Sequence, residues 1–80
     1  MKEIRCFGIA KDIVKGDYLL LNVEDLPRTV GAFKIWLAEK YPAFKALRHY
    51  AIGVNQTYAE DDHLLEGSDE IVIIPPVSGG

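Results

Sequence analysis

The chain has 80 residues, of which 49% are hydrophobic and 26% are charged, and its formal net charge at pH 7 is −3. This length predicts a single domain over residues 1–80, and the composition is typical of a globular protein. The negative charge argues against nucleic-acid binding, the single cysteine excludes an internal disulfide, and no apolar run approaches the roughly 18–20 residues of a membrane span. We therefore expect a cytoplasmic domain that binds neither nucleic acid nor a membrane.

The first residues alternate between polar and apolar, which predicts a strand. Because neighbouring side chains on a strand point to opposite faces, Ile4 and Cys6 should face the core and Phe7 should face outward. A short segment over 10–14 and a turn follow, and then a second strand over 18–23. The inward residues of that strand are predicted to be Leu19, Leu21 and Val23.

The clearest helix follows Thr29, whose hydroxyl can cap its N-terminus. Apolar residues then recur at helical spacing and predict one buried stripe. They are Val30, Phe33, Leu37 and Tyr41. Pro42 cannot continue the backbone hydrogen bonds, so the helix should end near Tyr41.

The second half of the chain predicts three more strands. After a connection of uncertain form, residues 49–54 and 57–59 are expected as strands on either side of a turn. Residues 70–74 are apolar on both faces, which is typical of a central strand. The order β-β-α-β-β-β predicts an α+β domain with one helix laid across a mixed sheet.

The last six residues are predicted to form an extended tail, 75–80, beyond a globular part, 1–74. Pro75 and Pro76 lack N–H donors, so they end the strand and stiffen the chain that follows. Gly79 and Gly80 have no side chains and can enter a narrow channel. The tail therefore favours a terminal carboxylate presented to the active site of another protein, although a frayed terminus is the alternative.

Several segments resemble the small subunit of molybdopterin synthase, the MoaD-like family of the ubiquitin-like β-grasp superfamily. These segments are Val54-Asn55-Gln56-Thr57, Gly67-Ser68-Asp69-Glu70 and Pro75-Pro76-Val77-Ser78-Gly79-Gly80. The tail and the Val-Asn-Gln motif are the most specific of them. In addition, residues 7–12 are similar to the family's Phe-Ala-x-x-Arg-Glu stretch, with Lys and Asp in place of Arg and Glu. The resemblance covers essentially the whole chain and implies a β-grasp fold with a flexible Gly-Gly tail.

The resemblance also implies a sulfur carrier. In that family a ubiquitin-activating-like enzyme uses ATP to adenylate the terminal carboxylate, here that of Gly80, and a sulfur donor system converts it to a thiocarboxylate. The carrier then docks on the large synthase subunit, in an expected heterotetramer, and gives its sulfur to the pyranopterin precursor of the molybdenum or tungsten cofactor. No cofactor is expected to be bound to the carrier itself.

A docking surface is predicted beside the tail. If Ile71 and Ile73 face the core, Val72 and Ile74 face outward with Phe7 and leave an exposed apolar patch, which commonly marks a partner surface. The tail residues between the patch and the glycines should contact the same partners. These are Pro75, Pro76, Val77 and Ser78. A sheet face covered by the chain's own loops is the alternative.

Other reactive residues favour structural roles. Cys6 should be an inert buried thiol, and one cysteine cannot supply the four ligands of an iron–sulfur cluster. His49 and His63 lack metal-ligand spacing, and the acidic run 60–62 is typical of a solvated loop, so no metal site is expected.

Three other functions stay open at this point. The chain could carry sulfur for thiamine or tRNA thiolation, or it could be a ubiquitin-like modifier joined to lysines. It could also be an adaptor that binds through its sheet and makes no use of its terminus. Deleting the two glycines separates the adaptor from the others, because only an adaptor would keep working.

Overall fold

The sheet has five strands in the order β2-β1-β5-β3-β4 in a computed structural model that describes residues 1–47 and 49–76. The strands are β1 (Lys2–Cys6), β2 (Tyr18–Leu21), β3 (Ala51–Val54), β4 (Thr57–Ala59) and β5 (Ile71–Ile74). β1 and β5 are parallel and the other three neighbouring pairs are antiparallel. The predicted mixed sheet, with the last strand at its centre, is confirmed.

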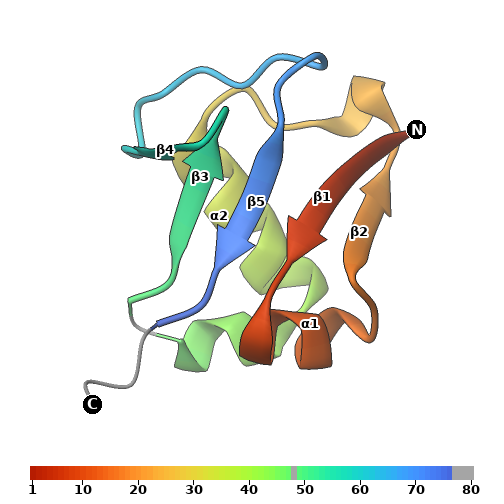
Figure 1. The fold of residues 1–80 in the computed structure, drawn as a ribbon, viewed down its shortest axis with the longest axis vertical. Helices are drawn as coiled ribbons and strands as arrows, with labels where there is room; N and C mark the ends of the chain where they lie inside the picture. Colours follow the sequence, from red (N-terminus) through yellow and green to blue (C-terminus); the bar gives the residue numbers. More distant parts are fainter. Residues whose placement is uncertain (48, 77–80) are drawn as a thin grey trace.

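The main helix, α2 (Val30–Lys40), packs on one face of this sheet. The Ala32 N–H donates to Thr29 Oγ1 at 3.1 Å, which confirms the predicted cap. The stripe residues Val30, Phe33 and Leu37 are fully buried. Figure 1 shows α2 behind the strands, while the opposite face of the sheet carries no helix over the described residues. We call that opposite face the outer face.

The predicted strand faces are confirmed along β1, β2 and β5. The inward residues Ile4, Cys6, Leu19, Leu21, Ile71 and Ile73 are all buried. They form one core with the stripe of α2. None of the helices in the described part of the chain is long and apolar enough to cross a membrane.

The prediction that Val23 faces the core is wrong. Lys2, the first residue of β1, pairs with Leu21, so the ladder between β1 and β2 ends there. The chain then turns into a short 3-10 helix, η1 (Val23–Asp25), in which the Asp25 N–H donates to the Asn22 carbonyl at 2.9 Å. Val23 is 48% exposed.

Three other segments differ from the sequence-based expectation. Residues 10–14 belong to a longer helix, α1 (Gly8–Val14). The connection after Pro42 contains a 3-10 helix, η2 (Pro42–Ala46), that places Phe44 in the core. The strand expected from residue 49 begins at Ala51, because its partner Ile74 is the last residue of β5. The preceding Tyr50 packs against the Phe44 ring, with 5.4 Å between ring centroids.

Candidate functional site

The base of the tail is held against the start of α1. β5 ends at Ile74, and Pro75 then packs on Gly8 so closely that a Cβ on Gly8 would lie 2.8 Å from Pro75 Cγ. Gly8 also has a φ of +55°, which favours glycine. This contact sets where the chain leaves the sheet. The predicted tail residues Val77, Ser78, Gly79 and Gly80 lie outside the described residues.

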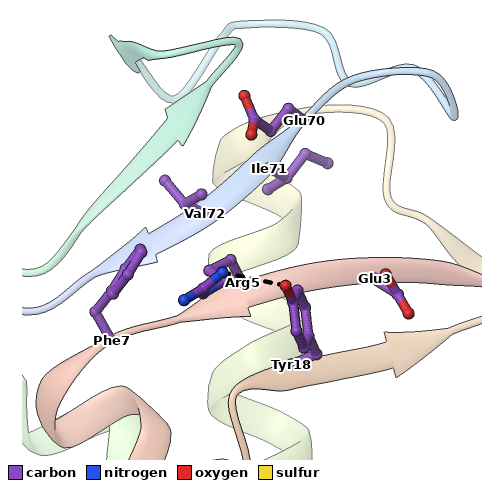
Figure 2. Close-up of a pocket in the computed structure, with 7 residues that line it drawn as sticks. All are labelled: Glu3, Arg5, Phe7, Tyr18, Glu70, Ile71 and Val72. Atoms are coloured by element: carbon purple, nitrogen blue, oxygen red, sulfur yellow. Dashed lines mark hydrogen bonds between the residues drawn. The ribbon is translucent and has the colours of Figure 1, made fainter.

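The predicted apolar patch lies on the outer face, next to the tail base. Phe7 is 43% exposed, and Val72 and Ile74 are half-buried. A Cβ on Gly53 would lie 2.8 Å from Val72 Cγ2 and 3.4 Å from Ile74 Cδ1, so these two side chains lie together over Gly53. Phe7 and Val72 line one pocket of about 290 Å³ (Figure 2).

The same pocket contains residues that the sequence analysis did not single out. Arg5 lies between the rings of Phe7 and Tyr18, with its guanidinium carbon 5.1 Å and 5.3 Å from the two ring centroids. It also donates to the Tyr18 hydroxyl oxygen at 3.1 Å (Figure 2). Glu3 and Glu70 line the pocket as well. Alternation along β1 places residues 3, 5 and 7 on one face, but Tyr18 joins them only through the register with β2.

The two internal segments that carry the family resemblance meet at the start of β5. Asn55 Nδ2 donates to Asp69 Oδ1 at 2.9 Å, and the Glu70 N–H donates to Asn55 Oδ1 at 2.9 Å. The Glu66 N–H donates to the other Asp69 oxygen at 2.7 Å. This bond and then the one from Asn55 lower the pKa of Asp69. The segments therefore hold the strand that leads to the tail.

Cys6, the last residue of β1, is 1% exposed, and burial raises the pKa of its thiol. Since the thiolate is the nucleophilic form, this side chain is poorly suited to accept sulfur. His49 and His63 are exposed, and within the described residues no group of three His, Cys, Asp or Glu side chains is arranged to hold a metal ion.

Comparison with known proteins places these features in a family context. The ThiS family profile matches residues 4–80. Small archaeal modifier protein 1 from Methanosarcina acetivorans is 27% identical, with 98% of this chain and 94% of that chain covered and a TM-score of 0.71. The protein of the same name from Haloferax volcanii is 24% identical, with 99% and 98% covered and a TM-score of 0.75.

A third solved structure comes from Pyrococcus furiosus and is described as a candidate molybdopterin converting factor, subunit 1. It is 19% identical, with 94% of this chain and 95% of that chain covered and a TM-score of 0.77. At these identities and scores the shared property is the fold. The predicted ubiquitin-like β-grasp is confirmed.

Proposed function

This chain belongs to the ThiS family, and from that premise we propose that it is a sulfur carrier whose reactive group is the Gly80 carboxylate. The observation that carries the proposal is the family match itself, which runs to residue 80 and includes the Pro-Pro-Val-Ser-Gly-Gly ending. The position of the tail base beside an exposed apolar face supports it.

The proposed chemistry takes place in two steps on the terminal carboxylate. An activating enzyme joins the Gly80 carboxylate to AMP from ATP and releases pyrophosphate. Hydrosulfide from the sulfur donor system then attacks the acyl carbon, AMP leaves and the S–H proton is lost, which yields the thiocarboxylate. A carboxylate is a poor electrophile, so the adenylate supplies the leaving group, and the anionic thiocarboxylate sulfur is the activated nucleophile for the later transfer.

The carrier leaves acid–base catalysis to its partners. Its one thiol is buried, and Asp69, a carboxylate with a lowered pKa, is engaged in holding β5. The acyl adenylate is open to hydrolysis, so the activating enzyme must enclose it away from water. Residues without side chains at the end of the tail suit that enclosure.

We assign the carrier to molybdopterin synthesis, in which it acts as the small subunit of a heterotetrameric synthase. The resemblance of the ending to that family supports this choice, as does the similarity to the Pyrococcus furiosus structure. In this proposal the large subunit and the activating enzyme both use the patch of Phe7, Val72 and Ile74. Because adenylation consumes ATP, we propose a cytoplasmic location.

Protein modification is the second candidate function. The similarity to the modifier protein of Methanosarcina acetivorans favours it. Both functions begin with the same acyl adenylate, and they diverge when either sulfur or a lysine amine displaces AMP. A modifier would therefore show the same dependence on Gly80.

Intact mass measured on the chain purified from its native cells tests the proposal. Exchange of oxygen for sulfur at the terminus adds about 16 Da, the mass signature of the thiocarboxylate nucleophile. A chain that lacks Gly79 and Gly80 is the control and should show no gain. If the chain is found only in amide linkage to other proteins, the modifier function is favoured. If the chain that lacks Gly79 and Gly80 still performs its function in the cell, the chain is an adaptor.

A further inference from the structure

One row of residues crosses all five strands on the outer face. The register pairs Tyr18 with Arg5, Arg5 with Val72, Val72 with Gly53, and Gly53 with Tyr58. The two edge tyrosines are exposed, Tyr18 by 45% and Tyr58 by 73%. Gly53 has no side chain of its own, and the Val72 and Ile74 side chains lie over it. The row therefore places Arg5 between the Tyr18 ring and the apolar side chain of Val72.

Arg5 is the cation of this row, and its side chain is already fixed. The Phe7 and Tyr18 rings lie on either side of its guanidinium at 5.1 Å and 5.3 Å, and the Tyr18 hydroxyl accepts one of its hydrogen bonds. A guanidinium has five N–H donors in a planar fork that matches a carboxylate. Because these contacts already restrict the Arg5 side chain in the free protein, binding a partner costs less side-chain entropy.

Arg5 has no ion-pair partner within residues 1–47 and 49–76. The side-chain ion pairs in these ranges are Lys11–Asp17 and Lys34–Asp61. Glu3 and Glu70 line the same pocket but form no ion pair with Arg5. A fixed, exposed arginine whose remaining donors face a pocket is a binding group for an acidic side chain.

The surrounding charges select the class of partner. A polyphosphate chain would approach Glu3, Glu70 and a molecule of net charge −3, which repel it. A single carboxylate beside an apolar side chain meets Arg5 together with Phe7 and Val72 instead. The pocket therefore suits a protein that presents Asp or Glu next to an apolar residue.

We propose that Arg5 determines docking specificity by receiving an Asp or Glu side chain of the activating enzyme, while Phe7 and Val72 contact an apolar neighbour of that acid. The inference rests on the proposed function, which supplies this partner. The activating enzyme is chosen because adenylation begins both the sulfur-carrier and the modifier pathway. In this proposal Arg5 takes no part in the chemistry at the terminal carboxylate, so its replacement affects binding and leaves the chemical step intact.

The test measures binding of the full-length chain to the purified activating enzyme by calorimetry, at low and at high salt. Arg5→Gln should weaken binding by about tenfold or more, because the partner's carboxylate then loses its charged donor. Arg28→Gln is the matched control, with the same change of charge at an exposed residue in the loop before α2, and it should bind as the wild type does. The affinity of the Arg5→Gln variant should also depend less on salt.

Two further variants separate charge from geometry. Arg5→Lys keeps the charge without the planar fork and should recover only part of the affinity. Tyr18→Phe keeps the ring and removes only the hydroxyl that accepts from Arg5, so it should give a smaller loss than Arg5→Gln. For the Arg5 and Tyr18 variants, the adenylation rate at saturating carrier should be unchanged while KM rises, whereas Arg28→Gln should change neither.

The outcomes are distinct. If Arg5→Gln binds as tightly as Arg28→Gln while the wild type is bound and adenylated, the inference is overturned and the proposed function stands. If Arg5→Gln lowers the saturated adenylation rate and leaves KM unchanged, the docking role is also overturned. If the wild-type chain is neither bound nor adenylated, the proposed function fails and the inference fails with it.

Discussion

Replacing Asp69 by asparagine tests whether the contact between the two family segments holds β5 in place. Asp69 is 8% exposed and accepts from Glu66 N–H at 2.7 Å and from Asn55 Nδ2 at 2.9 Å. The asparagine oxygen can accept only one of these bonds, and its NH2 group must face the other donor. Asn55 cannot turn its amide to compensate without losing the 2.9 Å bond from the Glu70 N–H.

The expected cost follows from the loss of one hydrogen bond to a charged group. Such bonds contribute about 1.5–3 kcal/mol, which is a large part of the roughly 5–15 kcal/mol that stabilises a typical domain. For a chain of this size, a loss of about 2 kcal/mol lowers the melting temperature by roughly 8–16 °C.

The pH dependence of the unfolding free energy gives a second, independent test of this prediction. The pKa of Asp69 is lowered from its ordinary value of 3.8 in the folded chain. The charged carboxylate therefore contributes stability above its unfolded pKa, and this contribution is lost as pH falls through the folded pKa. The stability difference between wild type and Asp69→Asn should be constant near neutral pH and should shrink below about pH 4.

Urea denaturation at pH 7 and pH 3, followed by circular dichroism, measures both quantities. Asp62→Asn is the matched control, because Asp62 is exposed and the change in charge is the same. A stability of the Asp69 variant equal to that of the Asp62 variant at pH 7 would refute the reasoning. So would a difference between wild type and the Asp69 variant that does not change with pH.

Three further outcomes are expected. Deleting Gly80 should abolish the thiocarboxylate, whereas Cys6→Ala should retain it, and intact mass checks both variants. Cys6→Ala should also cost about 1 kcal/mol in unfolding free energy, which thermal melting checks. A folded Cys6→Ala variant without sulfur would contradict the terminal assignment. Phe7→Lys should weaken binding to both the activating enzyme and the large subunit in calorimetry, with an unchanged melting temperature because Phe7 is 43% exposed. Thr29→Ala should remove the cap of α2 and cost about 1 kcal/mol in urea denaturation, and no measurable loss would show that the cap is dispensable.

Short-range sequence patterns predicted the helix and strand features that depend only on residues close together in the chain. Thr29, the spacing of Phe33 and Leu37, and Pro42 mark the main helix from its cap to its end. Alternation predicted the faces of β1 and β5 because a strand has a strict period of two. The same rule gave the outward position of Phe7, which joins Val72 in one pocket.

The errors and omissions arise from contacts between distant segments. Val23 continues the alternation of β2, but its position depends on where β1 ends, and Lys2 already pairs with Leu21. The helix α1 has seven residues, too few for a clear period. It begins at Gly8, where both the positive φ and the close approach of Pro75 favour glycine. Arg5 looks like any exposed strand residue until the register places Tyr18 beside it.

The length of chain between the outer face and Gly80 limits the distance between a partner's docking surface and its reactive centre. β5 carries the tail and pairs with β1 on one side and β3 on the other, so a partner bound on the outer face also fixes the direction of the tail strand. Val72, which pairs with Arg5, precedes Gly80 by eight residues (80 − 72). A fully extended chain of that length spans at most about 29 Å. Under the proposed function, a partner that binds the outer face at Arg5 and acts on Gly80 must hold its reactive centre within this distance, and two such partners cannot use the same tail at once.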